Sequence, residues 1–200
     1  MKKQPRAWVM ILLVAVFWGL FFSSVRLTAD KLSCDYPSRE ASESGLLREI
    51  RIGIFAHDVD HLWSKMHLEE GIDFNAEILF SRPCIRALSG ILFPNLGITI
   101  NDSGNTSKCY AGFLWEWTTR WGIFLDLGLG VAIHNGELNT PVPGRKLLGC
   151  RVLFRIPFEL GYRISSRFRI SLMFSHVSNG YTTEYNQGLD VLGVRLGYCF

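Results

Sequence analysis

Three side chains near the C-terminus have the types and spacing of a nucleophilic hydrolase site. His176 and Ser178 are two residues apart, and Asp190 follows after a polar segment. A serine hydroxyl is a weak nucleophile until a histidine takes its proton, and a carboxylate holds that histidine in the productive tautomer. We therefore expect Ser178 to act as the nucleophile, His176 as the general base and Asp190 as the acid that orients His176.

The site has a second candidate for its acid, and a simpler explanation as a whole. Glu184 is also close to His176 in sequence, but it falls at the expected loop tip, where a charge is ordinarily solvated. A histidine and a serine near the end of a strand are often only interfacial polar residues. The spacing and shared parity of all three side chains favour catalysis with Asp190.

Two predicted strands position these side chains. Residues 168–178 alternate between apolar and polar types, and the apolar parity continues into His176 and Ser178. Residues 189–200 alternate in the same way, and their apolar parity extends back to Asp190. When the two strands pair around the turn between them, His176 lies opposite Asp190, with Cβ atoms about 5 Å apart. All three polar groups then face outward, on the apolar side of the sheet.

Alternation with a period of two recurs along the chain and predicts further strands. In the segment 148–162, apolar residues occupy one parity, while Arg151, Arg155 and Glu159 occupy the other. A run of this length exceeds the usual soluble strand of about five or six residues and suits tilted membrane strands of about ten. We expect eight strands, at residues 50–58, 72–80, 92–100, 110–117, 123–134, 148–162, 168–178 and 189–200.

The fold class predicted from this pattern is all-β, an eight-stranded antiparallel transmembrane β-barrel. A sheet that spans a membrane must close, because unpaired strand edges are not tolerated in hydrocarbon. The charged parity then faces inward, and its mixture of signs indicates a packed salt-bridge network in place of a solute pore. The inward charged residues are expected to be Asp73, Glu77, Asp126, Arg151, Arg155, Glu159, Arg169 and Arg195.

The N-terminal segment differs from the rest of the chain. Lys2, Lys3 and Arg6 precede an uncharged apolar run over residues 7–22, which small residues follow. This order is typical of a secretory signal peptide, and the run is short for a spanning helix of about twenty residues. An uncleaved membrane anchor is the alternative. We expect a signal peptide at residues 1–29, with its cleavage position left open, and a single outer-membrane barrel domain at residues 30–200.

Composition argues against several classes of partner. The chain is 48% hydrophobic and 20% charged, with a net charge of +3, which is too balanced for a nucleic-acid-binding protein. Its five cysteines show no zinc-type spacing. His57, Asp58, Asp60 and His61 superficially resemble a metal cluster, but His57 and Asp58 would point to opposite faces of a strand. We expect no metal, no cofactor and no nucleic-acid partner.

The site motif resembles the signature of a known family. The stretch His176-Val177-Ser178-Asn179-Gly180 and the stretch Asn186-Gln187-Gly188-Leu189-Asp190, followed by a strand to the terminal Phe200, are similar to those of the PagL-type lipid A 3-O-deacylases. The resemblance implies an outer-membrane esterase of a Gram-negative bacterium. Its substrate would be lipid A, as part of lipopolysaccharide, from which it removes the acyl chain ester-linked at position 3.

The same resemblance implies roles for individual residues. His176, Ser178 and an acid would be presented on the outer wall of the barrel. Asn179, Gly180 and Asn186 would stabilise the oxyanion or position the substrate. The acid of this family is ordinarily glutamate, so Asp190 is a departure, and its shorter reach bears on efficiency more than on mechanism.

Other functions stay open at this point. A non-enzymatic barrel for adhesion or envelope integrity would use the polar patch only to meet lipid headgroups, and would leave lipid A unchanged. A soluble periplasmic barrel that binds a lipid inside conflicts with the charged inward parity. The oligomeric state is open between a monomer and a homodimer.

Overall fold

The described residues form β-strands joined by turns and loops. The computed structural model describes residues 45–64, 66–83 and 85–200. The expected signal peptide, 1–29, lies outside this range. Within the described part of the chain, no helix is long and apolar enough to cross a membrane.

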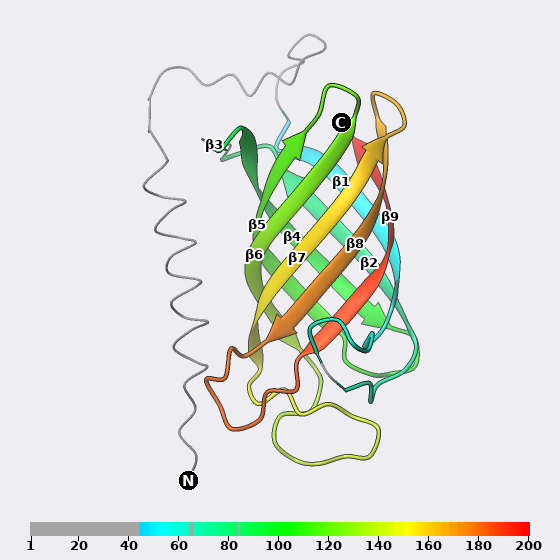
Figure 1. Ribbon diagram of the computed structural model, residues 1–200, viewed down its shortest axis with the longest axis vertical. Helices are drawn as coiled ribbons and strands as arrows, with labels where there is room; N and C mark the ends of the chain where they lie inside the picture. Colours follow the sequence, from blue (N-terminus) through cyan, green and yellow to red (C-terminus); the bar gives the residue numbers. More distant parts are fainter. Residues whose placement is uncertain (1–44, 65, 84) are drawn as a thin grey trace.

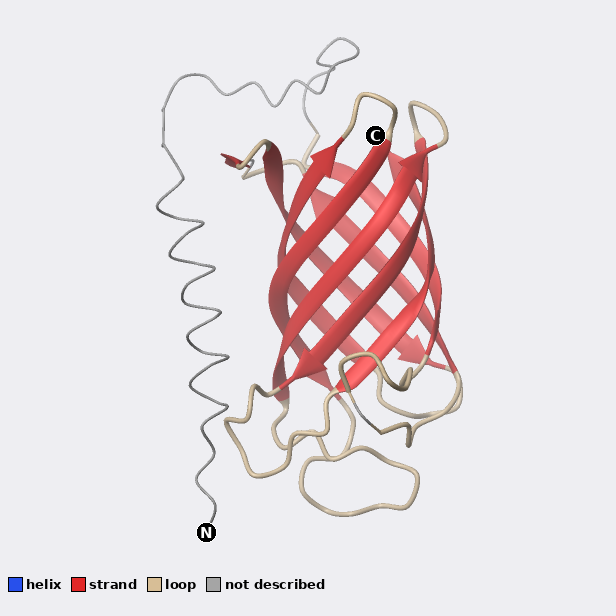
Figure 2. Cartoon of the chain, in the orientation of Figure 1, coloured by secondary structure: helices blue, strands red, loops and turns tan. Residues whose placement is uncertain are grey.

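Eight long strands close into an antiparallel barrel (Figures 1 and 2). Strand β1 pairs with both β2 and β9, and β2 pairs with β4, which closes the ring through β5 to β8. This confirms the predicted fold class. A short ninth strand, which the sequence pattern did not predict, pairs only with the start of β4. The strands are β1 (Leu47–Ala56), β2 (Ile72–Phe80), β3 (Ile85–Ala87), β4 (Gly90–Asn101), β5 (Lys108–Thr118), β6 (Ile123–His134), β7 (Val152–Arg163), β8 (Phe168–Ser178) and β9 (Leu189–Cys199).

A network of buried ion pairs fills the barrel interior. Arg51 lies 2.7 Å from Asp126 and 2.9 Å from Glu159, and Arg195 lies 2.9 Å from both Glu77 and Glu159. Charges removed from water are tolerated only when they are paired. Seven of the eight expected inward charges are buried, which confirms their direction; they are Asp73, Glu77, Asp126, Arg155, Glu159, Arg169 and Arg195.

The prediction is wrong for the eighth expected inward charge, Arg151. It is exposed and precedes β7, where it donates a hydrogen bond to the carbonyl of His134. Gly149 interrupts the alternation with a φ of +80°, and a Cβ there would meet the carbonyl oxygen of Tyr185 at 2.0 Å. The chain therefore bends inward before β7 begins, and Leu148 is buried in the apolar cluster of Tyr110, Ala132, Leu153, Val177 and Leu189.

The two ends of the barrel differ in the length of their connections. Short turns at residues 119–122 and 164–167 lie at the same end as the C-terminus, and long loops lie at the opposite end (Figure 1). In outer-membrane barrels the longer loops are extracellular. We call the long-loop end the outer end, and it carries the residues at the end of β8 and the start of β9.

Candidate active site

The hairpin of β8 and β9 brings His176 and Asp190 together. The two residues are direct partners in the strand register, as predicted. Nδ1 of His176 lies 2.6 Å from Oδ1 of Asp190. A carboxylate accepts a hydrogen bond from a protonated Nδ1, so this contact selects the tautomer whose Nε2 is free to accept a proton. Glu184, the other candidate acid, is exposed in the hairpin loop.

Ser178 lies on the same face of β8 as His176, at its outer end. Residues two apart in a strand are separated by about 6.7 Å, a distance that an imidazole ring and a serine hydroxyl can span between them. Gly188 is close to the edge of the ring that carries Cε1 and Nε2. Its φ is +67°, and a Cβ there would lie 3.0 Å from Cε1 of His176 and 3.7 Å from Nε2. The missing side chain leaves the Nε2 edge uncrowded.

Asn179 and Asn186 shape the hairpin beside Ser178. The amide nitrogen of the Asn179 side chain donates to the carbonyls of Leu148 and Tyr185, at 2.9 and 2.6 Å, and is also 2.7 Å from Oγ1 of Thr183. This side chain is thus occupied within the loops. Oδ1 of Asn186 accepts a bond from the backbone N–H of Asn179 at 3.0 Å, which turns the NH2 group of Asn186 away from that contact.

A loop that the sequence motif does not include covers the site. The Trp63 ring stacks on His176, with ring centroids 4.7 Å apart and an interplanar angle of 17°. The backbone N–H groups of Trp63 and Ser64 donate to Oδ2 of Asp190 at 2.7 and 2.6 Å. His176 is only 5% exposed beneath this loop, and Asp190 is fully buried; Ser178 is also only 5% exposed. Their outward direction matches the predicted parity, but protein covers them.

Buried polar side chains hold this loop from beneath. His57 bridges two carboxylates, with Nδ1 2.7 Å from Asp73 and Nε2 3.0 Å from Glu69. Burial alone would raise the pKa of Glu69, but hydrogen bonds from His57 and from the backbone N–H of Lys146 lower it to about 2. Burial would lower the pKa of His57, whereas its bonds to Asp73 and Glu69 raise it overall.

The placement of His57 and Asp58 differs from the expectation. We expected these side chains on opposite faces of a strand, but β1 ends at Ala56. Asp58 has a φ of +49°, so the alternation stops here and both side chains are buried. Among the residues described, no group of three or more histidine, cysteine or acidic side chains is arranged to hold a metal ion.

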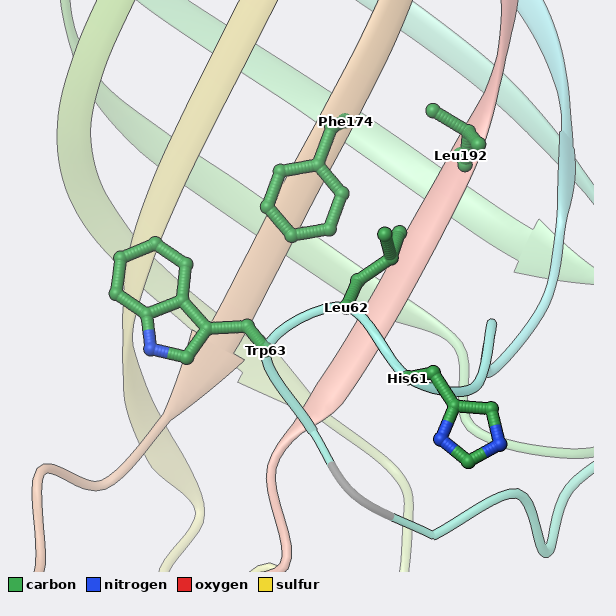
Figure 3. A pocket seen from close by; sticks show the side chains of 5 residues that line it. All are labelled: His61, Leu62, Trp63, Phe174 and Leu192. Atoms are coloured by element: carbon green, nitrogen blue, oxygen red, sulfur yellow. The ribbon is translucent and has the colours of Figure 1, made fainter.

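An apolar groove runs along the outer wall next to the site (Figure 3). It has a volume of about 380 Å³ and is lined by His61, Leu62, Trp63, Phe174 and Leu192. Phe174 precedes His176 by two residues in β8, and Leu192 follows Asp190 by two residues in β9. The groove therefore continues directly from the His176–Asp190 pair, and its lining suits a hydrocarbon chain.

Comparison with known families identifies the relatives of this barrel. The family model described as lipid A 3-O-deacylase (PagL) matches residues 94–199, just over half of the chain. The chain belongs to this family. The match includes β8, β9 and all six site residues that the sequence motif indicated. As a barrel of the PagL family, the protein is located in the outer membrane of a Gram-negative bacterium.

Solved structures are similar to this chain. The crystal structure of the outer membrane enzyme PagL is 16% identical to this chain, with a TM-score of 0.57, over 76% of this chain and 99% of that chain. The crystal structure of Neisserial surface protein A is 9% identical, with a TM-score of 0.48, over 76% and 96% of the two chains. At 16% identity, the likeness to the PagL crystal structure shows the fold alone. No curated protein matches the sequence.

Proposed function

We propose that this PagL-family barrel hydrolyses the ester that links an acyl chain to position 3 of lipid A, by a Ser/His/acid mechanism. The observation that carries the proposal is the 2.6 Å contact between His176 and Asp190, on the outer wall and beside Ser178. At the outer end of the barrel this group lies at the depth of the outer leaflet. Lipid A would reach it from the membrane without entering the barrel.

The proposed reaction has two stages. Oγ of Ser178 attacks the ester carbonyl while Nε2 of His176 takes its proton, and the tetrahedral intermediate then collapses. His176 returns the proton to the departing sugar oxygen, which leaves the acyl group on Ser178. A water molecule, deprotonated by His176, then attacks this acyl-enzyme, and His176 returns the proton to Oγ of Ser178 as a hydroxylated fatty acid is released. Asp190 keeps His176 in the correct tautomer and stabilises the imidazolium.

The oxyanion needs hydrogen-bond donors near Ser178. We assign this role to the NH2 group of Asn186 and to the backbone N–H of Gly180, because both lie in the hairpin that follows Ser178. Asn179 contributes by position: its side chain fixes the hairpin and its backbone N–H holds Asn186. No metal or cofactor is needed for this ester hydrolysis.

The apolar groove supports a long-chain substrate. Phe174, Leu192 and Trp63 would hold the acyl chain along the outer wall, with the ester next to Ser178. Burial of apolar surface contributes roughly 25 cal/mol per Å². The binding energy of the chain would thus place the carbonyl against the nucleophile.

Mass spectrometry of lipid A tests the proposal. The protein and its Ser178→Ala variant would be expressed in a Gram-negative host, and barrel insertion would be checked by heat-modifiable migration in gels. We expect loss of one ester-linked hydroxyacyl chain with the parent protein only. Unchanged lipid A despite an inserted parent barrel would reject the proposal in favour of a non-enzymatic barrel.

The domain boundaries are also a proposal. We propose that residues 1–29 are a signal peptide removed during export and that residues 30–200 form a single barrel domain. N-terminal sequencing of the protein purified from outer membranes tests this. A mature N-terminus at Met1 would contradict it and support an uncleaved anchor.

A further inference from the structure

The first outer loop, defined here as residues 57–71 without residue 65, supplies two of the hydrogen bonds that fix Asp190. Oδ1 of Asp190 faces His176, and Oδ2 accepts the backbone N–H groups of Trp63 and Ser64. The backbone N–H of Val59 also donates to the backbone carbonyl of Asp190, at 3.0 Å. Both carboxylate oxygens are therefore held, and the plane of the carboxylate is fixed relative to the imidazole.

The same loop restricts the imidazole itself. Trp63 stacks on one face of His176, and its ring also lies parallel to that of Phe174, with centroids 6.5 Å apart. The stacked indole on one face and the bond from Nδ1 to Asp190 together restrict rotation of the imidazole about its side-chain bonds. The loop thus positions both the acid and the base.

Lys146, from the third outer loop (residues 135–151), anchors the first outer loop. Its ammonium group forms an ion pair with Asp58 and lies 3.2 Å from Oγ of Ser64. Asp58 in turn accepts the backbone N–H groups of Leu68 and Glu69 at 2.7 and 3.0 Å. The side chains of Lys146 and Asp58 are both completely buried.

This anchor is connected to the site by one residue. Ser64 accepts from Lys146 through its hydroxyl oxygen and donates to Asp190 through its backbone nitrogen. A buried ion pair is costly to break by removing one partner, because the remaining charge stays in a poorly solvated site. The pair is therefore well suited to hold the Ser64 amide in one place.

We propose that Lys146, paired with Asp58, is a positioning residue for the hydrolysis, acting on Asp190 and His176 through the backbone of Trp63 and Ser64. This inference rests on the proposed esterase function. It also accounts for an aspartate at the acid position. The hydrogen bonds from the loop orient Asp190, whose side chain is shorter than that of glutamate. Lys146 does not touch the substrate in this scheme.

The test compares turnover by purified protein in detergent micelles, with lipopolysaccharide as substrate. The double variant Asp58→Asn/Lys146→Met removes the ion pair and leaves no unpaired charge at either position. We expect its kcat to fall about tenfold to a hundredfold, the range caused by a misplacement on the order of 1 Å. Arg151→Met, which removes a positive charge from the end of the same third loop, is the matched control and should keep the parent rate.

A double-mutant cycle separates positioning from general damage. If the anchor acts through Asp190, the double variant should lose no more than twofold further activity in an Asp190→Ala background, since coupled residues are not additive. A full additional loss in that background, or a kcat within twofold of the parent in the native background, would overturn the proposal.

A second variant covers failure of the double variant to fold. Ser64→Pro deletes the N–H that Asp190 accepts, and Ser64→Ala keeps it while removing only the hydroxyl. We expect about a tenfold loss of kcat with proline and a smaller loss with alanine; equal activity of the two would contradict the proposal.

Ser178→Ala is measured in parallel. Activity in Ser178→Ala rejects the esterase mechanism itself, whereas an inactive Ser178→Ala with an unaffected Ser64→Pro rejects only the role of the loop.

Discussion

Replacing Asp190 by asparagine should disable the base by changing its tautomer. Asp190 accepts three hydrogen bonds: one from His176 on Oδ1 and two from the backbone of Trp63 and Ser64 on Oδ2. Asparagine has only one acceptor oxygen. Turning its NH2 group toward the loop would lose two bonds and oppose two donors, whereas turning it toward His176 loses one. The second orientation is preferred, because a bond to the neutral amide contributes about 0.5–1.5 kcal/mol and each buried N–H left without an acceptor costs about 1–3 kcal/mol.

The consequence falls on Nε2 of His176. An NH2 group facing Nδ1 requires Nδ1 to accept, which moves the imidazole proton to Nε2, on the side of Ser178. His176 then cannot take the serine proton. A wrong tautomer of this kind costs about 10⁴ in kcat. This factor corresponds to an increase of about 5 kcal/mol in the activation free energy.

The assay is the release of hydroxylated fatty acid from lipopolysaccharide by purified Asp190→Asn protein, quantified by mass spectrometry. Glu184→Gln, which changes the exposed loop carboxylate, is the control and should keep the parent rate. Retention of more than a tenth of the parent kcat in a folded Asp190→Asn barrel would refute the tautomer argument. Loss of activity in Glu184→Gln would instead assign the acid to the loop.

Three further predictions concern the ring edge, the interior and the loop. Gly188→Ala should lower kcat about tenfold, since φ is +67° and the added Cβ meets Cε1 of His176 at 3.0 Å; an unchanged kcat in the same fatty-acid release assay would show that the ring edge tolerates a methyl group. Arg195→Met should reduce the free energy of unfolding by about 3–5 kcal/mol, because two buried glutamates each lose one of their arginine partners; a loss below about 1 kcal/mol in denaturant titration would contradict this. The first outer loop should resist proteolysis best between pH 4.5 and 6.5. The raised pKa of His57 gives stability that is complete below the ordinary pKa of 6.5 and is lost as pH rises through the raised pKa. The lowered pKa of Glu69 gives stability that is complete above the ordinary pKa of 4.5 and is lost as pH falls toward about 2. Faster cleavage at pH 5.5 than at pH 9, corrected for protease activity on an unfolded substrate, would reverse that sign.

Strand parity made much of the fold and part of the site predictable. The membrane requires apolar side chains such as Leu172 outside, and the packed interior requires paired charges such as Arg169 inside. Each strand therefore has a fixed register relative to its neighbours. That constraint predicts His176 opposite Asp190, and the observed pairing agrees.

The loops could not be predicted from the sequence because their apolar and polar residues follow no regular period. Leu148 turns into the barrel mouth and Arg151 turns out. The residue types alternate through this segment, but the backbone conformation of Gly149 breaks the strand there. The contribution of Trp63 and Ser64 was also missed. Backbone N–H donors leave no mark in the residue types, and these two residues are more than a hundred positions from Asp190. The only sequence signal was an apolar Leu62-Trp63 pair within a polar stretch.

The most direct measurement of the central claim is covalent trapping of the nucleophile. A long-chain alkyl phosphonofluoridate resembles the tetrahedral intermediate of an acyl ester and reacts with activated serines. We predict that purified protein takes up one equivalent, that peptide mapping places it on Ser178, and that the deacylation rate falls in proportion to labelling. The His176→Ala variant should label at least a hundredfold more slowly. Labelling of another residue with loss of activity, or full activity after Ser178 is completely labelled, would contradict the account.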